Sequence, residues 1–133
     1  MKIKFITTLI FLLLGQLVIA GDFAQEANDN PFLNGELNAK YEGEATALAG
    51  EILEIKQTKQ KYPAYKLNLS INNIKNIWVT SIAPPPEGGV NIGDMIVFKG
   101  FISTASELDP SGELEALINS KTLLMAIQSQ KVN

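Results

Sequence analysis

The strongest constraint on the fold of this 133-residue chain is a strict alternation of apolar and polar side chains over residues 65–71. A period of two places every second side chain on the same face of a β-strand. One face of the strand must then be buried and the other hydrated, which is typical of an antiparallel sheet. The apolar positions are Tyr65, Leu67, Leu69 and Ile71.

Four further segments are rich in β-branched and aromatic residues and are bounded by turn-forming residues. In the first of them, Ile52 and Ile55 break the alternation, which predicts a bulged or bent strand. A single helical turn is expected over residues 113–118, after a turn at Asp109–Gly112. The four predicted strands cover residues 50–56, 77–82, 95–102 and 123–128.

Five short strands with connections of unequal length predict an all-β fold of small α content, a closed barrel in residues 49–133. Asn72–Asn73 offers a hairpin turn between the second and third strands. Pro84–Pro86 must end the third strand and continue as an extended loop, because proline has no backbone N–H and a fixed φ.

The run from Gly93–Asp94 through alternating apolar residues to Lys99–Gly100 resembles the fourth strand of OB-fold proteins. The preceding stretch Asn38–Tyr41 is similar to the lead-in of exported bacterial OB-fold proteins of the tRNA-anticodon-like type. That resemblance implies binding of oligonucleotides, oligosaccharides or proteins on one face of the barrel, and it carries over no catalytic residues. The sequence departs from the family pattern at Pro84–Pro86, between the third and fourth strands, where OB-folds commonly have a helix.

The N-terminus has the pattern of an export signal over residues 1–20. Lys2 and Lys4 precede the apolar run Phe5–Ile19, and the small residue Ala20 is suited to cleavage before Gly21. An uncleaved membrane anchor is the alternative, because the run is not far below the roughly 20 residues that span a bilayer. We therefore expect an exported protein, periplasmic or secreted, with no stable membrane span after cleavage. Residues 21–48 are expected to form a tether or lead-in, with a possible short helix within residues 37–48.

The composition restricts the chemistry that this protein can perform. It contains no histidine and no cysteine, and every basic residue is lysine. Catalytic triads with histidine, cysteine nucleophiles and ordinary zinc or copper sites are therefore excluded. Only carboxylate, lysine, serine or tyrosine chemistry would remain, so we predict a non-enzymatic module without cofactor or metal.

A candidate ligand site follows from the distribution of charge. No acidic residue occurs between Glu54 and Glu87, whereas lysines and aromatic residues gather there. On an OB-like barrel this window covers the first loop and the second and third strands, the usual ligand surface. The alternative is that these lysines only keep a loop hydrated. The candidate binding residues are Lys56, Lys59, Lys61, Tyr62, Lys66, Asn68 and Trp78.

The position of Trp78 depends on the register of the hairpin between the second and third predicted strands. A two-residue turn would place Leu67 opposite Trp78 and send the indole into the core. A three-residue turn would place Leu67 opposite Val79 and leave Trp78 outside, near Lys66. The second register is favoured because it buries Ile77 and Val79.

These features predict an exported binding module that meets a protein partner, or an anionic or sugar ligand, on one barrel face. The alternative is a structural component of a cell-envelope assembly, in contact through residues 21–38 and the loop Pro84–Gly89. Binding of single-stranded nucleic acid is less expected. Cleavage removes Lys2 and Lys4, so 9 basic residues face 14 acidic ones, a net charge of −5.

Overall fold

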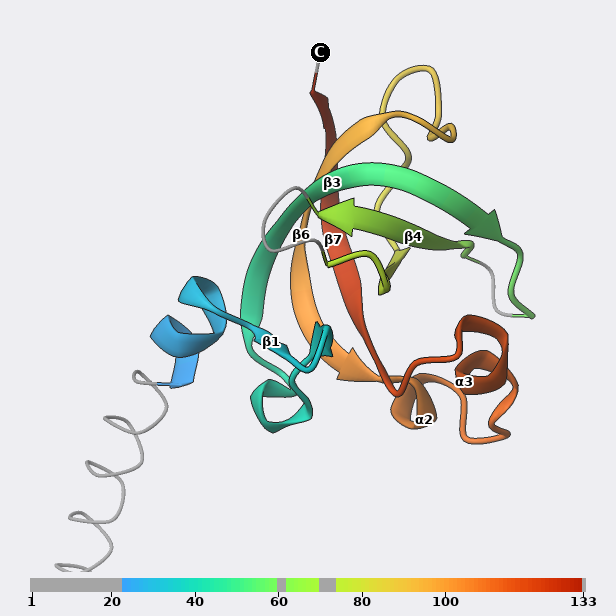
Figure 1. Ribbon diagram of the computed structural model, residues 1–133. Coiled ribbons are helices and arrows are strands. Elements are labelled where there is room, and N and C mark those ends of the chain that lie inside the picture. Colours follow the sequence, from blue (N-terminus) through green and yellow to red (C-terminus); the bar gives the residue numbers. More distant parts are fainter. Residues whose placement is uncertain (1–22, 60–61, 70–73, 133) are drawn as a thin grey trace, which may run out of the picture.

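The computed structural model describes residues 23–59, 62–69 and 74–132, and its centre is a closed five-stranded barrel (Figure 1). Around the barrel the order is β3-β4-β5-β7-β6, with β6 closing onto β3. Every pair is antiparallel except β5 with β7. This is the OB-fold arrangement, and it confirms the predicted all-β barrel. The strands are β3 (Ala45–Lys56), β4 (Ala64–Leu69), β5 (Ile77–Ser81), β6 (Met95–Thr104) and β7 (Thr122–Val132).

Two short helices, α2 (Ala105–Leu108) and α3 (Glu113–Ile118), lie in the connection from β6 to β7. The helical turn predicted at residues 113–118 is therefore confirmed. Asp109 fixes the turn before it, because its carboxylate accepts hydrogen bonds from the Ser111 backbone and hydroxyl and from the Leu114 N–H. The segment from Ile82 to Asp94 contains no helix, as the three prolines require.

Residues 23–44 pack against the barrel and are not a free tether. Residues 23–29 are helical, and β1 (Phe32–Leu33) pairs with β2 (Glu36–Leu37). Ala27, Leu37 and Tyr41 are buried in the same apolar cluster as the barrel core. Tyr41 also donates a hydrogen bond of 2.8 Å from its hydroxyl to Glu26. The lead-in therefore adds apolar area to the core of the barrel.

The helix expected within residues 37–48 is replaced by one 3₁₀ turn, Ala39–Tyr41, followed directly by β3. Ala45, Ala47 and Ala49 are exposed, whereas Thr46 and Leu48 are buried, so this stretch has a period of two. The expected helix is thus limited to this single turn, because alanines on the outer face of a strand have the same spacing as part of a short helix.

Two register shifts bend the barrel wall. The first, between Ile52 and Glu54, confirms the bulge predicted from the broken alternation. The second lies where β6 meets β7: Lys99 faces Gln128 and Gly100 faces Ala126, so Ile127 has no opposite residue. A Cβ on Gly100 would lie 2.6 Å from the Ala126 Cα and would overlap the Met125 carbonyl. Only glycine permits this close approach.

The second hairpin has neither of the registers considered above. Leu67 faces Ile77 and Lys66 faces Trp78, and more residues separate β4 from β5 than either turn allows. The inner face still contains Leu67, Ile77 and Val79, as the favoured register requires. The longer connection explains the error, because a two- or three-residue turn was assumed.

Several predictions lie outside the described residues, namely the signal peptide at residues 1–20, the Asn72–Asn73 turn and the candidate ligand residue Lys61. Within the described ranges, no helix has both the length and the apolar character needed to cross a bilayer.

The close approach at Gly100 predicts a large effect of a single methyl group. Gly100→Ala should lower the free energy of unfolding by about 3 kcal/mol, the upper end for an overpacked interior, because the backbone of β7 must move. Gly43→Ala is the matched control: Gly43 has a φ of +88° and open space around it, so only about 1 kcal/mol of left-handed strain is expected. Urea unfolding of both variants measures the difference, and equal losses would contradict the proposed role of Gly100.

Candidate functional site

The barrel face predicted to bind ligands is covered by the chain itself. Trp78 points outward from β5, opposite Lys66, yet it is only 2% exposed. Its indole N–H donates to the Asn76 side chain at 3.2 Å. An exposed aromatic platform at Trp78 is therefore ruled out. The residues that enclose Trp78 are Ala64, Ala105, Leu114, Ile118 and Leu123, from β4, α2, α3 and β7.

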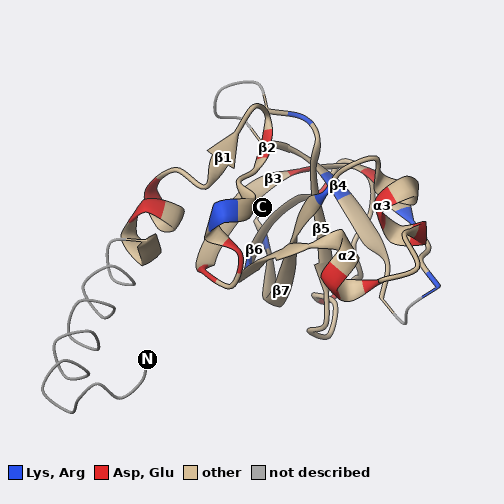
Figure 2. Cartoon of the chain, turned by 90° about the horizontal axis from the view of Figure 1, so that it is seen from below, with Lys and Arg blue, Asp and Glu red and all other residues tan. Residues whose placement is uncertain are grey.

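The lysines near α2 and α3, the helices that cover Trp78, are paired with carboxylates that lie outside the acid-free window of residues 55–86. Lys59 Nζ lies 2.7 Å from Glu113 of α3, and this contact raises the Lys59 pKa. Lys56 and Lys66 lie 4.0 and 3.6 Å from Glu54. Figure 2 shows acidic segments of α3 near the basic segments of the β3–β4 connection. Each of these three lysines thus has a carboxylate nearby in space, with Glu54 shared between Lys56 and Lys66.

Lys56 also ties α3 to the barrel. Its Nζ donates to the Leu117 carbonyl at 2.9 Å and lies 5.5 Å from the centre of the Trp78 ring. A buried indole beneath a lysine ammonium is a favourable cation–π contact. These interactions identify Lys56, Lys59 and Trp78 as residues that hold α3 in place.

The other candidate ligand residues that the structure describes lie on different surfaces. Asn68 faces Glu51 in the β3–β4 ladder and is half-buried. Tyr62 is exposed and lies on a different surface, the one formed by the segment after β5 and by β7. Among the candidate residues that the structure describes, Tyr62 alone lines that surface.

The barrel wall is open beside β7 because of the proline run. β5 pairs with β7 only over Val79–Ser81 and Leu124–Ala126, and one more bond joins the Ile82 N–H to the Ala126 carbonyl. Pro84 and Pro85 have no N–H to continue this ladder. Within the described residues, Gln128–Val132 of β7 pair with β6 alone, and Ile127 pairs with neither β5 nor β6.

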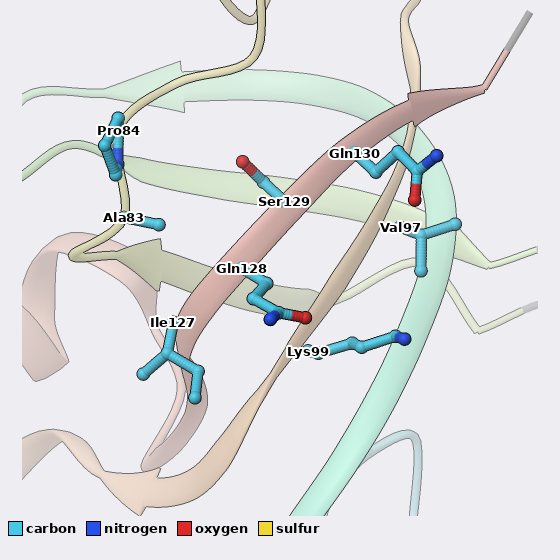
Figure 3. Close-up of a pocket in the computed structure, with 8 residues that line it drawn as sticks. All are labelled: Ala83, Pro84, Val97, Lys99, Ile127, Gln128, Ser129 and Gln130. Atoms are coloured by element: carbon cyan, nitrogen blue, oxygen red, sulfur yellow. The ribbon is translucent and has the colours of Figure 1, made fainter.

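Three adjoining cavities, of about 430, 420 and 380 Å³, follow this opening and the outer face of β6 and β7. The first two share Ala83, Pro84 and Ser129, and the first and third share Lys99, Ile127 and Gln128. We call this continuous surface the β7 groove. Figure 3 shows Ala83 and Pro84 on one side of β7, with the Ser129 hydroxyl directed toward them. Its exposed apolar side chains are Tyr62, Ile82, Phe101 and Ile127.

The β7 groove has no carboxylate among its lining residues, although the chain is acidic overall. Its one cation is Lys99, which is exposed and forms no ion pair with the part of the chain that the structure describes. The Ser129 Oγ is buried and makes no hydrogen bond there. The groove therefore offers apolar contacts, one free positive charge and an unsatisfied hydroxyl.

Two further interactions stabilise the elements that carry the groove. Asp94, before β6, accepts a 2.8 Å hydrogen bond from the Asn91 N–H and lies 3.3 Å from Lys131 of β7. The Asn91 backbone and Lys131 hold the pKa of Asp94 below its usual value. Tyr65 stacks on Phe98 at the inner end of the groove, with ring centroids 5.8 Å apart, and burial raises its pKa.

Sequence reasoning missed most groove residues. One usable signal was the outward apolar pair Val97 and Phe101 on β6, since outward positions of a hydrated strand are expected to be polar. The other was Pro84–Pro86, which cannot continue a ladder. Within the described residues no cluster of three or more acidic groups could hold a metal ion.

No protein-family model matches this sequence, and no curated protein matches it significantly. Among solved structures, it is similar to the OBody AM3L15 bound to hen egg-white lysozyme, with a TM-score of 0.49 and 12% identity over 71% of this chain and 80% of that one. It is also similar to the S. pombe Stn1–Ten1 complex, with a TM-score of 0.46 and 10% identity over 74% and 70%. The OB-fold assignment made above depends on the strand order of this chain and not on these similarities.

The covered position of Trp78 can be tested by fluorescence, because it is the only tryptophan. The wild-type emission should be blue-shifted and resistant to iodide. Asp109→Ala removes the hydrogen bonds that position α3 and should increase iodide quenching, with a loss of about 1–2 kcal/mol in unfolding free energy. Glu107→Ala, at an exposed site on α2, is the control. A red-shifted, readily quenched wild-type emission would contradict the burial of Trp78 beneath α2 and α3.

Proposed function

We propose that this protein is an exported, non-catalytic OB-fold binding module of the tRNA-anticodon-like type, and that its β7 groove binds a protein partner. The observation that carries the proposal is a continuous groove without carboxylates on an acidic protein. Exposed apolar side chains that adjoin in a groove mark interaction surfaces. Ile82, Phe101 and Ile127 supply such contacts here.

The chemistry of the groove favours a protein over a polyanion or a sugar. Binding to a nucleic-acid backbone depends on several free lysines or arginines, whereas the groove has only Lys99. The window lysines Lys56, Lys59 and Lys66 are already paired with glutamates. Trp78, the aromatic platform expected for a sugar, is covered, and the exposed aromatic side chains Tyr62 and Phe101 line different cavities of the groove.

A structural role in an envelope assembly is compatible with the same surface. Pro84 and Pro85, expected as assembly contacts, line the groove. Residues 23–38 support that role less, because Ala27 and Leu37 are buried in the barrel core. The groove is therefore the surface on which both functions are tested.

Export is supported by the positive start, the apolar run and the small residue Ala20 at the N-terminus. The expected result is a mature protein that begins at Gly21 and is found in the periplasm or the medium. Edman sequencing of protein purified from fractionated cells measures it. Protein that starts at Met1 would contradict cleavage, and protein that stays in the cytoplasm would contradict export.

A photoreactive amino acid at position 127 tests the groove in cells. Ile127 is 45% exposed, so the substitution disturbs no core, and a discrete cross-linked partner is expected. The same amino acid at position 92 is the control, because Ile92 is 68% exposed and outside the groove. Adding Lys99→Glu should reduce the cross-link at position 127 several-fold, because it reverses the only charge of the groove.

Equal cross-linking at positions 127 and 92, or none at position 127, would contradict a partner in the β7 groove. A cross-link that Lys99→Glu leaves unchanged would contradict the electrostatic part of the proposal. The fold of each variant is checked by the blue-shifted emission of Trp78, which lies under α3 and away from these positions.

A further inference from the structure

We infer that the β7 groove takes its partner as an extended peptide, which adds a strand to the open edge of β7 at Ile127–Val132. This inference rests on the proposed function and specifies the chemistry of its ligand. Addition of a strand to an exposed sheet edge is a general mode of peptide recognition. The ligand is a neutral to acidic segment with apolar side chains toward the groove.

The backbone of β7 supports this mode. Gln128–Val132 pair with β6 on one side, Ile127 bulges out of that ladder, and the structure shows no strand on their other side in the described residues. In a strand that is paired on one edge, every second residue still directs its N–H and C=O to the other edge. These groups are available for hydrogen bonds to another chain.

The proline run keeps the edge open. The segment that follows β5 would otherwise continue beside β7, as Ile82 begins to do. Pro84 and Pro85 cannot donate to the ladder, and with Ala83 they form the opposite wall of the groove instead. A strand needs about 4.8 Å beside its neighbour, and cavities of about 430 and 420 Å³ meet along this line.

Side chains at the edge suit a peptide as well. The register shift after Lys99 leaves Ile127 and Gln128 both exposed, so two successive side chains face outward at the start of the open edge. The buried Ser129 Oγ has no hydrogen-bond partner among the described residues.

Charge selects the kind of peptide. Lys99 is the only charged residue that lines the groove and is free of ion pairs in the described chain. One carboxylate in the ligand would pair with it, whereas a basic peptide would be repelled. The acidic net charge of the mature chain further disfavours a strongly acidic ligand. A peptide with one acidic residue among apolar ones fits both conditions.

The probe is a set of linear twelve-residue peptides selected from a phage-displayed library on the mature chain, with counter-selection on Ile127→Lys. The selected peptides should lack proline in their binding stretch and carry one Asp or Glu. N-methylation of each peptide residue in turn should weaken binding about tenfold or more at every second position and little between. Amide hydrogen exchange of Ile127–Val132 should slow when the peptide is bound.

The possible results separate the two proposals. Peptides that need Ile127 but tolerate N-methylation at every position would overturn strand addition and leave the groove as a binding surface. Peptides that bind Ile127→Lys equally well, or no selected peptides at all, would overturn both. A Lys99→Glu variant should lose the preference for the acidic residue, and an unchanged preference would overturn the charge pairing.

Discussion

The groove of this protein is open because Pro84 and Pro85 have no backbone N–H with which to continue the hydrogen-bond ladder beside β7. In a barrel, each strand satisfies its N–H and C=O groups on two neighbours. β5 satisfies β7 only as far as Ala126, and the prolines prevent the next residues from continuing. One edge of β7 is therefore left in contact with a groove. The same local rule that ends a strand thus creates a surface that is available to a partner.

The surface that OB-folds commonly use for ligands has another role here. α2 and α3 fill it with Leu114 and Ile118, and they enclose Trp78. The apolar contact excludes water from the indole, while Lys56 and Lys59 fix α3 at its edge. Burial of an indole contributes more to stability than an exposed ion pair does, so the lysines orient the cover more than they stabilise it.

Most of the fold could be predicted from the sequence because local rules agreed with the tertiary structure. Alternation identified the strands, broken alternation identified the bulge near Ile52, and Asp109–Gly112 preceded α3. The candidate site was less predictable, because the window of lysines was defined by neighbours in sequence. Glu113 approaches Lys59, and Glu54 approaches Lys66, only when distant segments come together, whereas Glu54 and Lys56 are two residues apart in β3. The length of the β4–β5 connection also escaped prediction, because two adjacent asparagines suggest a turn but do not fix its length.

The sequence by itself determined that this chain forms a small all-β barrel without histidine or cysteine chemistry, since periodicity and composition act through local and purely chemical rules. It also determined that no strand could continue through Pro84–Pro86. Only the tertiary structure decided which surface is open. Closure of the barrel placed α3 over Trp78 and carboxylates beside the lysines, and it left Lys99 and Ile127 exposed along β7. The contact of α3 with Trp78 and the pair of Glu113 with Lys59 join residues far apart in the chain, which no local pattern specifies.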